Sequence, residues 1–147
     1  MLVVPHPAAT LSVQFPKRST QRRRDAEERR AIVDAAVRVH SALGPGLLES
    51  AYEACLACEL REKGLGVVTQ VAVPLVYKDI ESETGYRVDM LVDDSVVVEI
   101  KTVGRVLPVH EAQVLTYLRL LRCRVGLLLN FYVPLMRDGI KRVVNGL

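Results

Sequence analysis

The stretch that decides the fold is RVDMLVDDSVVVEIK, residues 87–101. Both of its halves are rich in β-branched residues and the two aspartates between them are typical of a turn, so we expect a β-hairpin. Because side chains alternate between the two faces of a strand, Glu99 and Lys101 point the same way. Such a hairpin could bring Asp89 beside Glu99. We therefore expect two carboxylates and one ammonium group to share one patch of surface.

This combination of residue types fits a magnesium site that hydrolyses phosphodiesters. Mg²⁺ prefers oxygen ligands, keeps several waters, and is held by one or two carboxylates together with substrate phosphate. Asp89 and Glu99 would provide these two carboxylates. A lysine near such a site can orient the attacking water or stabilise the phosphoryl group, and Lys101 is placed to do so. Acidic hairpins and Glu-x-Lys strands are also common on ordinary surfaces, so a chance pattern remains the alternative interpretation of these three residues.

Composition restricts the class of protein. The chain has 147 residues, of which 50% are hydrophobic and 25% are charged, and this predicts one compact domain with a proper core. Charges interrupt every apolar run well before about 18 residues, so we expect no membrane-spanning segment. The N-terminus does not resemble a secretion signal, and three cysteines do not suggest a disulfide framework. A soluble protein of the cytoplasm is the expectation.

The positive charge is concentrated at the start of the chain. Residues 1–30 carry seven basic and three acidic side chains, so the net charge of +3 for the whole chain leaves the remaining residues slightly acidic. Such a basic arm can contact phosphates without sequence preference. The alternative is a solvated helix start or tail in which Glu27 and Glu28 offset part of the charge.

The rest of the chain alternates between helical and strand patterns. Hydrophobic spacing predicts two helices, from about Asp25 to Leu43 and then to Lys63, separated by a Gly-Pro-Gly turn. β-branched runs over 67–77, 84–92 and 95–102 predict an antiparallel meander. A helix over 108–121, a buried strand over 124–131 and a short edge strand over 139–144 are expected to follow.

Several segments resemble one family. GLLESAY, residues 46–52, fits the pattern that names the GxxExxY family, small proteins placed in the PD-(D/E)XK nuclease superfamily. Further matches follow in the same order: GYRVD (85–89), VEIK (98–101), LPVHEAQ (107–113), TYL (116–118), LLNF (128–131) and DGIKR (138–142). Val88 stands where the superfamily's name has proline, and valine keeps that strand paired.

The resemblance implies a fold and a division of the chain. It covers about residues 30–146 and implies a mixed α/β (α+β) fold with a restriction-endonuclease-like αβββαβ core, in which helices flank a mixed central sheet. Residues 1–24 are then an irregular basic N-terminal arm, and residues 25–147 form a nuclease-like domain.

The resemblance also implies a metal site. Asp89 and Glu99 would hold Mg²⁺ together with the backbone carbonyl of Ile100, with Mn²⁺ as an accepted substitute, and Lys101 would be the catalytic lysine. Nucleic acid is the implied partner, with DNA as the expected substrate. Members of the superfamily also work as homodimers or with a partner protein, so either assembly is compatible with this chain.

Two helices would complete the site. Glu49 would be the extra acid on the first core helix and Gln113 the polar residue on the following helix, and both would order the catalytic groups. The expected contacts to nucleic acid are Arg87, His110 and Tyr117. A solvated carboxylate at a helix start, a capping histidine and a packing tyrosine are the ordinary interpretations of Glu49, His110 and Tyr117.

Two hypotheses about function follow. The first is a Mg²⁺-dependent phosphodiesterase acting on nucleic acid. The second is a catalytically silent module on the same fold that binds nucleic acid or another protein. The first is favoured because every acidic and basic position of the site is filled, whereas the near-zero charge of residues 31–147 is modest for tight binding of DNA.

Overall fold

The computed structural model describes residues 18–82 and 85–146. Its helices are α1 (Arg18–Leu43), α2 (Glu49–Glu62), α3 (Pro108–Leu121) and the short 3-10 helix η1 (Met136–Gly139). Its strands are β1 (Val67–Ala72), β2 (Leu75–Tyr77), β3 (Ile80–Ser82), β4 (Arg87–Val92), β5 (Val96–Lys101), β6 (Val125–Asn130) and β7 (Ile140–Val144). No helix in the described ranges is both long and apolar enough to cross a membrane.

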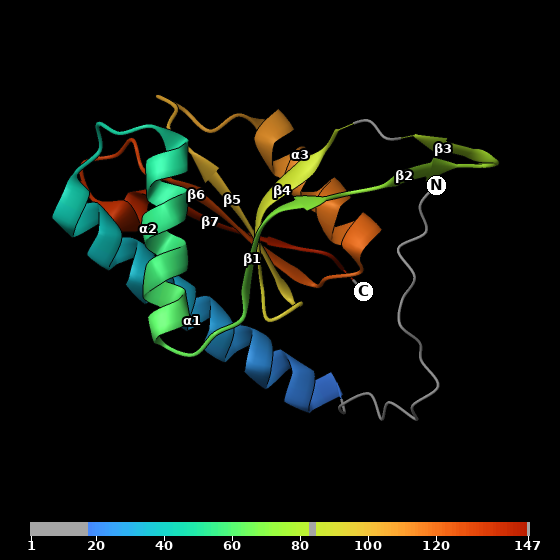
Figure 1. Cartoon of the computed structure of the whole chain (residues 1–147), viewed down its shortest axis with the longest axis horizontal. Helices are drawn as coiled ribbons and strands as arrows, with labels where there is room; N and C mark the ends of the chain where they lie inside the picture. The colour runs from blue at the N-terminus through green and yellow to red at the C-terminus, as the bar shows by residue number, and fades with distance from the viewer. Residues whose placement is uncertain (1–17, 83–84, 147) are drawn as a thin grey trace.

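Five of the strands form one mixed sheet in the order β1-β4-β5-β6-β7 (Figure 1). β1, β4 and β5 are antiparallel neighbours, β5 and β6 run parallel, and β7 pairs antiparallel with β6 at the edge. The predicted meander, buried strand and edge strand are therefore confirmed. The element order also confirms the mixed α/β class and agrees with a restriction-endonuclease-like fold.

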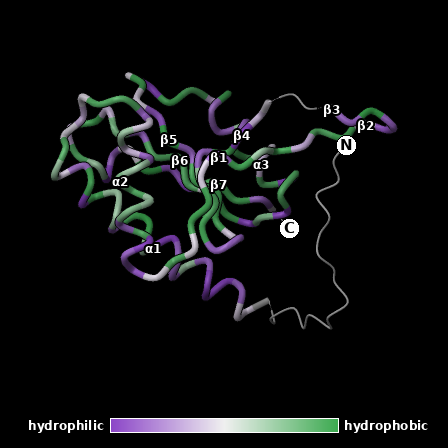
Figure 2. Tube along the Cα trace, in the orientation of Figure 1, coloured by the Kyte–Doolittle hydropathy of each residue, from purple (hydrophilic) through white to green (hydrophobic). Residues whose placement is uncertain are grey.

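Helices cover both faces of this sheet, and hydrophobic residues are concentrated along its central strands (Figure 2). α1 and α2 pack on one face, where their buried side chains meet Val98 and Ile100 of β5 and Leu127 of β6. α3 packs on the other face against Val97 and Leu128. Since neighbouring residues of β5 face opposite layers, alternation assigns the side chains of residues 99 and 101 to the α3 side of the sheet.

The strand predicted over 67–77 is in fact two strands. β1 ends at Ala72, and Pro74, which has no N–H to donate to a ladder, separates it from β2. β2 and β3 pair with each other in a separate two-stranded sheet that turns at Lys78, whose φ is 54°. This second hairpin projects beyond the main sheet (Figure 1).

The first helix begins earlier than the hydrophobic pattern predicted. α1 starts at Arg18 rather than near Asp25, so residues 18–24 of the predicted irregular arm are helical. Its first turns contain good helix formers, and the side-chain amide of Gln21 donates to Asp25 Oδ1 at 2.8 Å, one turn further on. The rest of the predicted arm, residues 1–17, lies outside the described residues.

Candidate active site

The candidate site is built on a reciprocal contact between β4 and β5. Backbone pairing of the two strands extends to Met90 and Val98, one position short of Asp89 and Glu99. Beyond that point, hydrogen bonds from side chains take the place of backbone pairing between β4 and β5. Glu99 Oε1 accepts a hydrogen bond from the Asp89 N–H at 2.9 Å, and Asp89 Oδ2 accepts one from the Ile100 N–H at 2.8 Å. Each carboxylate is thus held by the backbone of the opposite strand.

The Glu99 carboxylate is buried, and this changes its acidity. The residue is only 4% exposed. Burial is the main reason that the pKa of Glu99 rises from 4.5 to about 7, and the negative charge of Asp89 raises it further. The Asp89 N–H and the charge of Lys101 lower this pKa, while the charge of Glu49 raises it. Three other predicted site residues therefore act on the Glu99 carboxylate electrostatically.

Lys101 ends β5 and is fixed by the neighbouring strand end. Its carbonyl accepts a hydrogen bond from the Phe131 N–H at 2.9 Å. The buried Asn130 side chain accepts from the Val103 N–H at 3.1 Å and donates to the Val103 carbonyl at 2.9 Å. These bonds hold the chain at and just after Lys101, so its half-buried side chain starts from a fixed backbone. Asn130 was not among the predicted site residues.

A hollow of about 250 Å³ opens beside Asp89. It is lined from α2, β1 and β4 by Glu49, Ser50, Glu53, Gln70 and Asp89. Glu49 is the first residue of α2 and is exposed, and a carboxylate is favoured at this end of a helix. The structure therefore brings the predicted acid of the first core helix to the same hollow as Asp89.

Tyr52 fixes the turn that leads into α2. Its ring is fully buried and stacks on Phe131, with ring centroids 4.3 Å apart. Its hydroxyl donates to the Gly44 carbonyl and accepts from the Leu47 N–H at 3.1 Å. Gly44 has a φ of 73°, a conformation that favours glycine. Tyr52 is thus a packing residue that anchors the segment just before Glu49.

Tyr52→Phe should destabilise the protein by about 1 kcal/mol, because two backbone groups of the turn lose a partly buried hydrogen-bond partner. Urea unfolding followed by circular dichroism measures the change. Tyr132→Phe is the matched control, since Tyr132 is 57% exposed and should lose almost nothing. Equal stability of the two variants would show that the hydroxyl does not hold the turn.

Two of the three predicted residues of α3, Gln113 and Tyr117, also lie near the carboxylates. Tyr117 is 4% exposed, and burial is the first cause that raises the pKa of its hydroxyl. The charges of Glu99 and Asp89 raise this pKa as well, whereas a hydrogen bond with the Gln113 side chain lowers it. Since these charges act on the Tyr117 hydroxyl, α3 presents Tyr117 and its partner Gln113 to the same site.

Arg87 and His110 lie at the margin of this arrangement. Arg87 is exposed at the start of β4, and its Nη1 donates to the Gln70 carbonyl at 3.2 Å. His110 Nδ1 accepts from the Leu107 N–H at 3.0 Å, which makes His110 a capping residue of α3. Within the described residues, neither side chain forms a hydrogen bond or ion pair with the carboxylate pair.

Glu53 and Gln70, two of the residues that line the hollow, were not among the predicted site residues. Gln70 Nε2 donates to Glu53 Oε1 at 2.6 Å and lies 3.4 Å from Asp89 Oδ1. Burial raises the pKa of Glu53. Glu53 follows Glu49 by one helical turn on the same face, a spacing that the sequence displays. Nothing in the sequence marks Gln70, because its role depends on how β1 lies against β4.

The donor set suits a hard divalent cation. One oxygen of each carboxylate accepts a backbone N–H, which leaves Asp89 Oδ1 and Glu99 Oε2 as candidate ligands. A cation between them would offset the like charges of the half-buried Asp89 and the buried Glu99. In the described part of the chain, no three His, Cys, Asp or Glu side chains gather into a ready metal cluster. The candidate set is thus this pair, a number that Mg²⁺ commonly takes from a protein.

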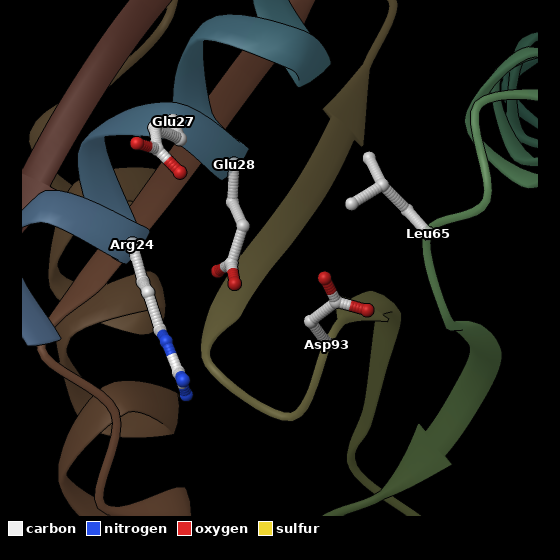
Figure 3. A pocket seen from close by; sticks show the side chains of 5 residues that line it. All are labelled: Arg24, Glu27, Glu28, Leu65 and Asp93. Carbon is white, nitrogen blue, oxygen red and sulfur yellow. The ribbon is translucent and has the colours of Figure 1, made fainter. Parts of the chain in front are cut away.

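A second hollow, of about 400 Å³, lies at the other end of the β4–β5 hairpin (Figure 3). Its lining comes from α1, the loop before β1 and the hairpin turn: Arg24, Glu27, Glu28, Leu65 and Asp93. Asp93 Oδ1 accepts from the Gly66 N–H at 2.7 Å, and Glu28 accepts from the Ser95 hydroxyl. These two acids therefore tie the hairpin turn to its neighbours.

Comparison with known proteins addresses the family. A family model described as the PD-(D/E)XK nuclease superfamily matches residues 26–143. No curated protein and no solved structure matched the chain. The matched range includes the hairpin with the carboxylate pair and the helices that carry Glu49 and Gln113. The chain therefore belongs to the PD-(D/E)XK nuclease superfamily.

Proposed function

We propose that this protein is a Mg²⁺-dependent nuclease that hydrolyses phosphodiester bonds of DNA. The observation that carries the proposal is the reciprocal pair of hydrogen bonds that holds the Asp89 and Glu99 carboxylates together beside Lys101. Membership in the superfamily supports the reaction class, because its members act on nucleic acid and typically use divalent metal ions.

Asp89 and Glu99 are the residues that would hold the metal, with the Ile100 carbonyl as a third oxygen donor. The Ile100 N–H bonds Asp89, and in an extended strand the N–H and C=O of one residue point to the same side, so the Ile100 carbonyl also faces β4. When bound, Mg²⁺, or Mn²⁺ in its place, lowers the pKa of a coordinated water and neutralises charge on the phosphoryl oxygens. The chain supplies the oxygens and a buried, fixed setting for them.

Lys101 then acts on the reacting groups. Its ammonium orients the attacking water and donates hydrogen bonds to a phosphoryl oxygen as negative charge develops there. The water oxygen forms a bond to phosphorus while the bond to the leaving oxygen breaks, which yields a phosphate monoester and a hydroxyl group. Glu49 and Gln113 order the polar groups around this centre. Arg87 and His110 contact the nucleic acid at the margin of the site, and the buried Tyr117 contacts it through its hydroxyl beside the carboxylates.

We further propose that the chain is a GxxExxY protein within the superfamily. The motif residues support this through their separate tasks: Tyr52 anchors the turn before α2, and Glu49 lines the hollow beside Asp89. Glu49 and Tyr52, one helical turn apart at the start of α2, thus serve the candidate site and the packing of the turn respectively.

Purified protein should cleave DNA in the presence of Mg²⁺ or Mn²⁺ and should lose that activity in EDTA. Single- and double-stranded DNA and RNA, incubated separately and resolved on denaturing gels, provide the measurement. Faster cleavage of RNA than of DNA would show that RNA, not DNA, is the substrate. Binding of nucleic acid without cleavage in either metal would favour a silent binding module over an enzyme.

A further inference from the structure

Gln70 has a backbone conformation that its position does not explain. It lies inside β1 with a φ of 53°, in the left-handed region that side chains other than glycine rarely adopt. The other non-glycine residues with positive φ among the described residues lie at turns or at a helix end: Lys78, Asp93, Asp94 and Arg122. Gln70 alone among them sits within a strand.

The strain at Gln70 coincides with a change of face in two strands. Thr69 pairs with Met90, and Val71 pairs with Val88, so Gln70 lies opposite Asp89. An unbroken strand would put Val88 and Met90 on one face of the sheet. Instead Val88 joins the core under α3, and Met90 joins the core under α1 and α2. β4 therefore changes the face of its side chains at Asp89.

β1 changes face at the same level. Val67 packs against the core under α1 and α2, whereas Val71 packs against the core under α3. The left-handed residue Gln70 lies between them. Both strands therefore change the face of their side chains at the same level, at Gln70 and Asp89. At this level the Asp89 carboxylate accepts a hydrogen bond from the Ile100 N–H of β5.

Gln70 is also held at both its side chain and its backbone. Its amide Nε2 donates to Glu53 Oε1 at 2.6 Å and to Asp89 Oδ1 at 3.4 Å, the Asp89 oxygen that accepts no backbone N–H from the described residues. Its carbonyl accepts from Arg87 Nη1 at 3.2 Å. Contacts from α2 and β4 thus keep the amide aimed at Asp89.

We propose that Gln70 is a positioning residue for Asp89: anchored by Glu53, it holds the Asp89 carboxylate in the orientation that receives the metal ion. This inference rests on the proposed metal-dependent function. Glycine would adopt the same φ without strain, but only a side chain with a donor can reach Asp89 Oδ1. The strain is then the consequence of placing an amide at this point of the sheet.

Gln70→Gly tests the inference, because it keeps the backbone conformation and removes the amide. Calorimetric titration of the metal-free protein with Mn²⁺ should show about tenfold weaker binding, as expected for the loss of an outer partner of a metal ligand. The melting temperature of the metal-free variant should not fall, since strain is relieved. Glu53→Ala, which releases the anchor of the amide, should weaken Mn²⁺ binding in the same direction.

Arg122→Gly is the matched control. Arg122 has a φ of 57° at the end of α3, so this variant relieves the same strain away from the hollow and should leave Mn²⁺ affinity unchanged. Equal Mn²⁺ affinities of Gln70→Gly and wild type, with binding lost in Asp89→Asn, would overturn the inference and leave the proposed function standing. A wild-type protein that binds no Mn²⁺ would overturn the proposed function and the inference together.

Discussion

Lys101→Ala should lower the rate of DNA cleavage by about 100- to 1000-fold and leave the protein folded. This range is typical when one group that stabilises transition-state charge is removed from a buried site. Lys101 is half-buried at the end of β5, close enough to Glu99 that its charge lowers the pKa of that carboxyl. Single-turnover cleavage of labelled DNA at saturating Mg²⁺ measures the effect on the chemical step.

Metal binding separates the role of Lys101 from that of the carboxylates. Lys101→Ala removes a positive charge near Asp89 and Glu99, so its affinity for Mn²⁺ should be equal to or higher than that of wild type. Asp89→Asn should lose both Mn²⁺ binding and cleavage, because it removes a charged ligand. Lys63→Ala is the matched control, since Lys63 is exposed at the end of α2. A folded Lys101→Ala variant with full activity would remove Lys101 from the mechanism.

The part of the site on β4 and β5 could be predicted from sequence because its geometry is periodic. Alternation along a strand places Glu99 and Lys101 on one face, and the register that follows from the turn at Asp93 and Asp94 brings Asp89 opposite Glu99. The helix α2 was also predictable from hydrophobic spacing with the period of a helix, and α3 from Pro108 at its first position.

The limits of prediction have physical causes as well. Hydrophobic spacing does not mark the start of α1, since its first turns are polar and are stabilised by helix-forming residues and local contacts such as the Gln21–Asp25 bond. The break between β1 and β2 was signalled by Pro74, but the extended pattern on both sides masked it.

Gln70 illustrates a deeper limit. Its left-handed φ occurs together with contacts from Glu53 and Arg87, which are distant in the sequence, and glutamine has no local preference for that conformation. Similarly, Asn130 gains its role only because β5 and β6 run parallel and end at the same edge. Residues of this kind are found from tertiary structure, whereas the carboxylate pair is found from a repeating local pattern.

The metal-free protein should lose stability as the pH rises from about 4.5 toward 7. Glu99 has its ordinary pKa of 4.5 in the unfolded chain and a pKa of about 7 when folded, so the folded state binds more protons within this window. Stability falls with rising pH wherever the folded state binds more protons, and a shift of this size corresponds to about 3 kcal/mol. Urea unfolding in EDTA between about pH 5 and pH 8 measures the slope.

Glu99→Gln tests the origin of that slope, because the amide stays neutral at every pH. The variant should retain a shallower decline, since burial also raises the pKa of Glu28 and Glu53. Mg²⁺ selects the ionised carboxylate, so it should stabilise wild type more at about pH 8 than at about pH 5 and should stabilise Glu99→Gln little at either. An unchanged slope in Glu99→Gln would mean that folding does not raise the pKa of Glu99. The pH dependence of stability would then not come from the carboxylate that is proposed to bind the metal.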